Sequence, residues 1–256
     1  MTTEATDARA DGAGAAEGAG EAGEVVGLLL AAGGGRRLGG RPKALLEHRG
    51  RPLVEHAVRV LREAGCERIH VVLGASADIV RARASLPGCV LVDNPDWEQG
   101  MGSSLRAGLD SLRETEAGTA TDTGTVTDAA TGTATAATAG AALVSLVDQP
   151  GIGPAAIARV RAAYRSPMTL AAASYEGRRG HPVLFGSGHW AGIAARAVGD
   201  RGARDYLREH AAEIVLVPCG DIAEEYDIDT AEDLVRLEPA PGISPSDTPE
   251  TPAHVE

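Results

Sequence analysis

The sequence predicts an α/β protein, a three-layer sandwich in which helices cover both faces of a mostly parallel β-sheet with an antiparallel addition. Apolar runs of strand length alternate with segments that carry a helical apolar face, which is typical of βαβ units with right-handed crossovers. Two later apolar runs, 169–174 and 182–185, bracket a Gly/Arg turn and predict the antiparallel pair.

Each element has a local signal of its own. The first strand, 25–30, is an uninterrupted apolar run, and the helix predicted at 52–64 has a periodic apolar face that ends at Gly65. A short helix at 76–84 begins at Ser76, which we expect to cap it. The other predicted strands are 68–73, 89–92, 142–147 and 214–217, and the other predicted helices are 103–113, 154–164, 202–210 and 231–237.

Three segments lack the large apolar side chains that offset the entropy of ordering a chain. We therefore expect disordered tails at 1–24 and 238–256, around one domain at 25–237 that contains a low-complexity surface insertion at 115–141. These segments carry the whole formal net charge of −12, so the remaining body is formally neutral. A neutral body gives no indication of a basic nucleic-acid surface.

The chain has three widely separated cysteines and no CxxC pair, which argues against a disulfide framework. No apolar run approaches the roughly 18 residues of a membrane span. The first residues lack the cationic and apolar regions of a signal peptide. We expect a cytoplasmic protein with neither a nucleic-acid nor a membrane partner.

The most informative segment, 28–43, reads LLLAAGGGRRLGGRPK and continues directly from the first predicted strand. Glycine allows a ligand to approach the backbone closely, and exposed N–H groups at such a strand end bind phosphate oxygens. Arg36, Arg37 and Lys43 add positive charge. The segment predicts a polyphosphate site, and the alternative is a tight turn with solvated arginines.

Two common phosphate-binding motifs do not fit this segment. The last glycine of a dinucleotide-binding GxGxxG is displaced by one position, to Gly39. The second strand ends in Leu-Gly-Ala (73–75), without the acid that binds a ribose hydroxyl. A Walker loop requires Lys followed by Ser or Thr where residues 40–41 are Gly-Arg.

The segment instead resembles the signature LAAGxGxRLGxxPK of the MobA-like nucleotidyltransferases, and the likeness extends over 25–237 apart from the insertion. The branch it resembles contains molybdopterin cytidylyltransferase and actinobacterial proteins named after nicotine blue oxidoreductase. The resemblance implies a Rossmann-like three-layer sandwich of the nucleotide-diphospho-sugar transferase type. It also implies a nucleotide-binding loop, with Arg37 and Lys43 as catalytic residues. The loop residues are Leu30, Ala31, Ala32, Gly33, Gly34 and Gly35.

A second segment, 94–106, matches the family pattern NPxWxxGMGSSL. A helix that begins near Ser103 offers unpaired N–H groups at its first turn. The resemblance implies contacts with the base and sugar from Asn94, Gly102, Ser103 and Ser104. The alternative is a loop followed by an ordinary serine cap.

Acidic residues at two places suit a metal. Asp148 follows an all-apolar strand, and Mg²⁺ prefers one or two carboxylates together with phosphate oxygens and water. The resemblance implies that Asp148 is catalytic and holds Mg²⁺ with a second acid, either Asp227 or Asp229, in a stretch similar to the family's DIDTPEDL. Thr230 with Asp233 is alternatively a capping motif. The strand ends at AAGGGRR, DNP and DQP would lie side by side in a parallel sheet.

The third matching segment contains Gly180, His181 and Pro182, which the resemblance places in the acceptor pocket. Arg178 and Arg179 precede them and suit an anionic acceptor. A histidine before proline is alternatively a plain turn residue.

The sequence therefore predicts a Mg²⁺-dependent nucleotidyltransferase that moves a nucleoside monophosphate from a nucleoside triphosphate to a phosphorylated small-molecule acceptor and releases pyrophosphate. The branch implies CTP, molybdopterin and transient contact with molybdoenzymes or their chaperones. Two alternatives stay open: an NAD(P)H-dependent reductase of a quinone-like pigment, and a non-catalytic nucleotide-binding cofactor chaperone.

Overall fold

A computed structural model describes residues 23–121 and 138–237, and the predictions for 1–22, 122–137 and 238–256 lie outside these residues. Seven strands form one sheet in the order β5–β4–β1–β6–β8–β7–β9. Only β8 runs antiparallel to its neighbours, which are β6 and β7. The strands are β1 (Glu24–Leu30), β4 (Ile69–Leu73), β5 (Val90–Asp93), β6 (Ala139–Leu146), β7 (Leu170–Tyr175), β8 (Arg178–Gly186) and β9 (Ile214–Pro218).

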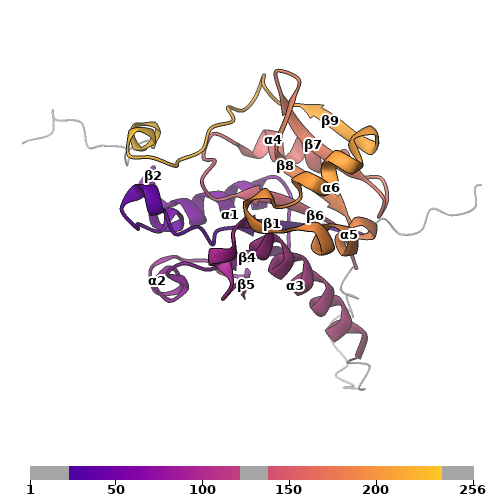
Figure 1. Cartoon of the computed structure of the whole chain (residues 1–256), viewed down its shortest axis with the longest axis horizontal. Coiled ribbons are helices and arrows are strands. Elements are labelled where there is room, and N and C mark those ends of the chain that lie inside the picture. Colours follow the sequence, from indigo (N-terminus) through magenta and orange to yellow (C-terminus); the bar gives the residue numbers. More distant parts are fainter. Residues whose placement is uncertain (1–22, 122–137, 238–256) are drawn as a thin grey trace, which may run out of the picture.

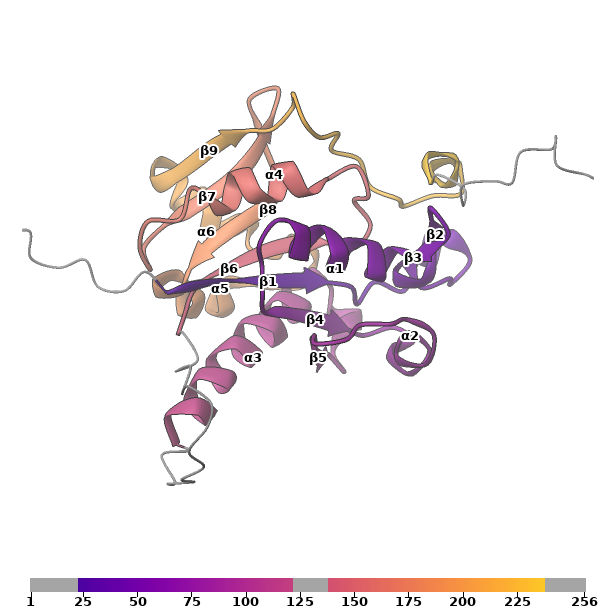
Figure 2. The same ribbon diagram turned by 180° about the vertical axis from the view of Figure 1, so that it is seen from behind.

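Helices cover both faces of this sheet, which confirms the predicted three-layer α/β class (Figures 1 and 2). One face carries α1 (Leu53–Glu63) and α4 (Pro154–Arg161). The other carries α3 (Met101–Thr121), α5 (Trp190–Arg196) and α6 (Arg204–Glu209). A small hairpin of β2 (Glu47–His48) and β3 (Arg51–Pro52) precedes α1, and α2 (Ala77–Arg83) follows β4. None of the helices within the described ranges is long and apolar enough to cross a membrane.

The central strand β1 supplies both hydrophobic layers because its side chains alternate between the two faces of the sheet. Val25 and Leu29 pack in the layer that contains α1 and α4. Val26 and Leu28 pack in the layer that contains α3, α5 and α6. All four are nearly fully buried, and burying one such side chain contributes about 1.5–3 kcal/mol. Because β1, β4 and β6 are parallel neighbours, these buried layers hold their carboxyl ends side by side at the same end of the sheet.

Several boundaries differ from the sequence predictions. The predicted tail reached Glu24, yet this residue begins β1 and pairs with Arg68. Helix α3 continues to Thr121 and β6 begins at Ala139, so both enter the stretch 115–141 that composition assigned to an insertion. For β6, composition misses these residues because strand pairing with β1 orders a small-residue segment that lacks large apolar side chains.

Two local predictions were wrong. Ser76 has φ of 57° and makes no side-chain cap hydrogen bond, because it lies in a left-handed turn rather than in the extended conformation of a capping serine. The final helix is a 3-10 helix, η7 (Glu232–Arg236). The sequence also gave no signal for α5, a short helix of mostly small residues.

Candidate active site

The glycine-rich loop leaves the carboxyl end of β1 and folds into a closed turn. The amide of Ala31 donates to the Val72 carbonyl (2.9 Å), which is the last bond to the neighbouring strand. The Gly35 carbonyl then accepts from the amides of Leu38 (2.8 Å) and Gly40 (3.0 Å). Gly35 has φ of 58°, and an added Cβ would lie 1.9 Å from the Arg41 carbonyl oxygen, so only glycine fits this position.

Gly33 and Gly34 present their backbone to the surface at this turn. Within the described ranges, neither amide donates to a protein acceptor. Unused N–H groups on successive residues form a concavity that binds anions. By contrast, Leu30, Ala31 and Ala32 are buried and support the loop through packing.

Trp97 packs against Gly34 of the same loop and against Gly74. An added Cβ on Gly34 would lie 3.0 Å from the Trp97 ring, and one on Gly74 would lie 2.5 Å from its Cβ. Trp97 begins the 3-10 helix η3 (Trp97–Gln99), which follows β5. The motif that contains Trp97 gives no sign of this contact with the glycine loop, because the two segments are far apart in the chain.

Lys43 joins two of the predicted acids. Its Nζ lies 2.6 Å from Oδ2 of Asp148 and also donates to Oδ1 of Asp229. Nη1 of Arg37 lies 3.9 Å from Oδ2 of Asp229. The side chains of Lys43 and Asp148 are 13% and 18% exposed, whereas Arg37 is 76% exposed. Residues from three distant parts of the chain therefore meet around one ammonium group.

Backbone and amide contacts decide which acid of the 227–229 stretch meets Lys43. The amide of Ile228 donates to the Asp148 carbonyl (2.9 Å). Nε2 of Gln149 donates to Oδ1 of Asp227 (2.8 Å). Asp227 is thus bound by Gln149, and Asp229 is the candidate that reaches Lys43.

The capping alternative for Thr230 and Asp233 also holds. Oδ2 of Asp233 accepts from the amides of Asp229 (3.1 Å) and Thr230 (2.8 Å) and from the Thr230 hydroxyl (2.9 Å). These three bonds and the positive charge of Arg236 lower the pKa of Asp233. The cap fixes the backbone that presents Asp229 to Lys43.

Burial and charge act in opposite directions within the Lys43 cluster. Burial raises the pKa of Asp148, the attraction of Lys43 opposes this rise, and the neighbouring Asp227 adds to it. Burial alone would lower the pKa of Lys43, but the two carboxylates outweigh it and raise that pKa. Lys43 is therefore fully protonated at neutral pH, and its charge stabilises the ionised acids.

The donor set at this place fits a divalent cation such as Mg²⁺. Asp148 and Asp229 converge on one cationic group, and Mg²⁺ needs only one or two carboxylates when phosphates and water complete its shell. Within the described ranges, no group of three or more His, Cys, Asp or Glu side chains forms a complete metal cage. An open site of two acids agrees with a metal that arrives with a nucleotide.

Asn94, Ser103 and Ser104 form a buried network beside the loop. Nδ2 of Asn94 donates to the hydroxyls of Ser103 (2.9 Å) and Ser104 (3.0 Å). The Ser103 hydroxyl lies within hydrogen-bond distance of the carbonyls of Asp96 (2.8 Å) and Gly100 (2.9 Å) and donates its one hydrogen to either of them. These bonds fix the 94–100 loop, which carries Trp97, to the first turn of α3. A direct contact of these residues with a nucleotide stays a prediction.

Gly102 lies at the same helix start but meets another part of the chain. An added Cβ would lie 2.7 Å from the carbonyl of Ala197, so glycine permits close packing of α3 against the segment after α5. This packing explains the glycine without a ligand, and its predicted nucleotide contact also stays a prediction.

Gly180, His181 and Pro182 lie on β8. The His181 carbonyl accepts from the Tyr175 hydroxyl (2.8 Å), and an added Cβ on Gly180 would lie 1.9 Å from Oε1 of Glu225. Burial, together with Arg204 and Arg179, lowers the pKa of His181 to about 4. Among the described residues, no hydrogen bond or ion pair joins this group directly to Lys43. Their place in an acceptor pocket stays a prediction.

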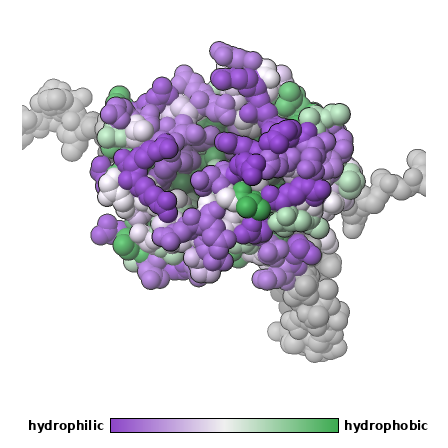
Figure 3. Space-filling view, viewed as in Figure 1, coloured by the Kyte–Doolittle hydropathy of each residue, from purple (hydrophilic) through white to green (hydrophobic). Residues whose placement is uncertain are grey.

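The face seen in Figure 3 is mostly hydrophilic and is hollowed near its centre, where hydrophobic residues are visible inside the hollow. Its few hydrophobic surface patches are small and separate. This face therefore shows a recess with a polar rim, the usual form of a small-molecule site.

Comparison with known proteins gives the site a family context. The model of the MobA-like NTP transferase domain matches residues 27–214. The nicotine blue oxidoreductase of Paenarthrobacter nicotinovorans is 40% identical over 220 residues, which cover 83% of this chain and 96% of that protein.

Solved structures have a similar fold. The manganese complex of Rv0371c from Mycobacterium tuberculosis H37Rv has a TM-score of 0.60 and 26% identity, over 84% of this chain and 97% of that chain. A nucleotidyl transferase from Methanothermobacter thermautotroptrophicus has a TM-score of 0.63 and 20% identity, over 84% and 96%. At that identity the second likeness shows the fold alone.

Proposed function

Because the chain belongs to the MobA-like NTP transferase family, a family of nucleotidyltransferases, we propose that it transfers a nucleoside monophosphate from a nucleoside triphosphate to a phosphorylated small molecule. The observation that carries this proposal is the meeting of Lys43, Asp148 and Asp229 beside a glycine loop with two unused amides. The specific substrates that we propose are CTP as the donor and molybdopterin as the acceptor. They come from the resemblance of this chain to the branch that contains molybdopterin cytidylyltransferase. Transient contact with molybdoenzymes or their chaperones would follow from that product.

Each residue of the cluster has a task in such a transfer. The amides of Gly33 and Gly34 bind phosphate oxygens, and the exposed Arg37 can reach the triphosphate from the solvent side. When the triphosphate enters, Lys43 exchanges part of its carboxylate contact for phosphate and stabilises the negative charge on departing pyrophosphate. Positioning and charge neutralisation supply most of the rate in this chemistry.

Asp148 and Asp229 are the residues that would hold Mg²⁺. The ion, when bound, neutralises charge on the phosphate oxygens and aligns donor and acceptor. The Asp227–Gln149 hydrogen bond and the Asp233 cap position these acids from behind. The structure of Rv0371c, which has a similar fold and 26% identity, is a manganese complex, and this supports the proposal of a divalent ion.

The proposal is tested first by binding. Thermal unfolding of the protein is followed with each nucleoside triphosphate, with and without Mg²⁺, because a ligand that binds only the folded state raises the melting temperature. We expect the largest increase with CTP and Mg²⁺. Pyrophosphate release from CTP and molybdopterin then measures transfer, and Lys43→Ala should reduce turnover by roughly two to three orders of magnitude. Unchanged turnover in this variant would exclude the assigned role of Lys43.

A second candidate function follows from the 40% identity to a protein named nicotine blue oxidoreductase. An NAD(P)H-dependent pigment reductase would oxidise the coenzyme in the presence of a quinone-like dye. The loop lacks the spacing of a dinucleotide site, and β4 is followed by Gly74 and Ala75 rather than by an acid.

One comparison separates the candidates. A transferase releases pyrophosphate and leaves NADH intact, a reductase does the opposite, and a nucleotide-binding cofactor chaperone binds the triphosphate but does neither. The three outcomes are measured on one preparation with CTP, NADH and a dye as alternative reagents.

A further inference from the structure

The indole of Trp97 lies across the junction of the loops that follow β1 and β4. An added Cβ on Gly34, in the loop after β1, would lie 3.0 Å from Cζ3 and 3.1 Å from Cη2 of the ring. An added Cβ on Gly74, which directly follows β4, would lie 2.5 Å from Cβ of Trp97. The amide of Ala75 donates to the carbonyl of Ala32 (3.1 Å) and joins the two loops. The ring is therefore held at a fixed place beside the glycine loop.

This indole carries a hydrogen-bond donor that the protein does not use. Within the described ranges, Nε1 of Trp97 has no protein acceptor, and it is not enclosed. Trp190, by contrast, is 2% exposed, and its Nε1 donates to the Phe185 carbonyl (2.9 Å). An indole nitrogen only donates, and it usually finds a partner where the ring is buried. The half-buried Trp97 thus presents a free donor beside the candidate site.

Three polar side chains near Trp97 in the chain are already engaged with protein partners. Asn94, Ser103 and Ser104 are at most 5% exposed, and Nδ2 of Asn94 donates to both hydroxyls. Oδ1 of Asn94 also accepts from the amide of Asp96 (3.0 Å). A ligand would have to open this buried network to reach these groups, and broken buried hydrogen bonds cost free energy. Trp97 can meet a ligand without any such change.

Trp97 and the Lys43 cluster lie on different flanks of the glycine loop. β4 and β6 are the two neighbours of β1 in the sheet. Asp148 follows β6 and binds Lys43, whereas Trp97 contacts Gly74 after β4. Nε1 and Cζ3 belong to opposite edges of an indole, so the free donor lies further from Gly34 than the ring atoms that contact it. A donor in this place suits the part of a nucleotide beyond the phosphates.

We propose that Trp97 contacts the nucleoside of the bound triphosphate and that its Nε1 donates to a base or ribose oxygen. This proposal rests on the proposed function, because it takes a nucleoside triphosphate as the ligand of the glycine loop. The loop amides and Lys43 bind phosphate oxygens, and Trp97 supplies affinity for the nucleoside through ring packing and one hydrogen bond.

Two kinds of ligand separate contact with the nucleoside from support of the loop. CTP and GTP carry a nucleoside and a triphosphate, whereas inorganic tripolyphosphate carries the phosphates alone. Isothermal titration of the full chain with each ligand and Mg²⁺ gives the ratio of nucleotide affinity to tripolyphosphate affinity. A residue that only supports the loop changes both affinities alike, and a residue that contacts the nucleoside changes the ratio.

Two variants at Trp97 and one control measure this ratio. Trp97→Phe keeps an aromatic ring without the donor, and Trp97→Leu removes the ring as well. We expect the ratio to fall about three- to tenfold in Trp97→Phe and at least about tenfold in Trp97→Leu. Trp190→Phe is the matched control, because it removes a buried indole donor and should lower the melting temperature without changing the ratio.

Fluorescence adds a readout that needs no substitution. CTP or GTP should change the tryptophan emission of the wild type, and Trp97→Phe, whose remaining tryptophan is Trp190, should lose this change. The proposal is overturned if both Trp97 variants keep the wild-type ratio, or if a nucleotide binds the wild type without changing its emission. In either case nucleotide binding itself stands. A wild type that binds neither CTP nor GTP would instead contradict the proposed function, and the contact of Trp97 with it.

Discussion

Replacing Lys43 by methionine tests whether its ammonium group stabilises the folded protein by compensating buried carboxylates, in addition to its proposed role in nucleotide transfer. Methionine keeps the apolar stem and removes the charge, so Asp148 would remain buried without its cation. Removing one partner of a buried ion pair costs about 3–5 kcal/mol. The side chains of Lys43 and Asp148 are 13% and 18% exposed, and Asp229 is 43% exposed. Because water reaches all three groups, we expect the low end, about 3 kcal/mol.

The loss of folding stability in Lys43→Met should depend on pH, and the pKa of Asp148 decides in which direction. Burial already raises the pKa of Asp148, and without Lys43 this pKa rises further above its unfolded value. A group whose pKa is raised in the folded state favours folding at low pH, and this contribution is lost as pH rises through the folded pKa. The deficit of Lys43→Met should therefore be large at pH 7 and should shrink on acidification.

Urea unfolding of the wild type, Lys43→Met, Asp148→Asn and the double variant forms a complete cycle. In the double variant the lone buried charge is gone, so most of the stability should return, while turnover stays at the level of Lys43→Met. A Lys43→Met protein as stable as the wild type at pH 7 would refute the reasoning. So would a double variant that is no more stable than Lys43→Met.

Three further predictions address the loop, the cap and acid stability. Gly35→Ala should destabilise the protein by about 2 kcal/mol or more and weaken nucleotide binding, because φ is 58° and the Arg41 carbonyl leaves no room; an unchanged melting temperature contradicts this. Asp233→Ala should lower the free energy of unfolding by about 1 kcal/mol and lower turnover by displacing Asp229. Asp233→Asn is the milder control, and equal kinetics in the two variants would show that the cap does not position Asp229. Burial holds the pKa of His70 near 4, so the unfolded chain binds more protons between pH 6.5 and 4 and stability should fall on acidification. His70→Gln should flatten this fall by up to about 3 kcal/mol while keeping a partner for Ser111, and an identical pH profile in urea unfolding would count against the shift.

The layer order of the fold was within reach of the sequence because hydrophobic periodicity is a local property. The continuous apolar run of β1 and the periodic apolar face of α1 are both present in consecutive residues, and both elements occur where they were predicted. The antiparallel β7–β8 pair was equally clear from its Gly/Arg turn. The ends were less predictable, since Glu24 and Ala139 join strands only because neighbouring strands pair with them.

The candidate site was likewise predictable from the sequence in part only. The residue types near the loop, a glycine run followed by Arg37 and Lys43, already indicated a polyphosphate, because each supplies donors or charge wherever the loop lies. Only the tertiary structure decided that Asp229 rather than Asp227 meets Lys43, since Gln149 engages Asp227 across 78 positions. It also showed Trp97 against Gly34, and Asn94 and its serines joined to one another.

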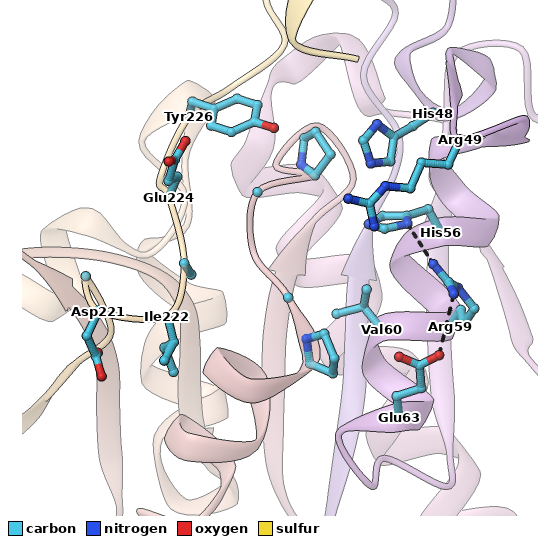
Figure 4. A pocket seen from close by; sticks show the side chains of 16 residues that line it. His48, Arg49, His56, Arg59, Val60, Glu63, Asp221, Ile222, Glu224 and Tyr226 are labelled. Carbon is cyan, nitrogen blue, oxygen red and sulfur yellow. Dashed lines mark hydrogen bonds and ion pairs between the residues drawn. The ribbon is translucent and has the colours of Figure 1, made fainter. Parts of the chain in front are cut away.

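The cavity between α1 and the segment 220–226 (Figure 4) was not foreseen at all. His56 occupies a position on the apolar face of a predicted helix, where a histidine reads as ordinary packing. The cavity exists because α1, the loop after β6 and the segment after β9 approach one another without closing. Local sequence determined which groups this protein carries, and long-range packing decided which of them lost water and which found a partner, because desolvation and hydrogen bonding depend on neighbours that are distant in the chain.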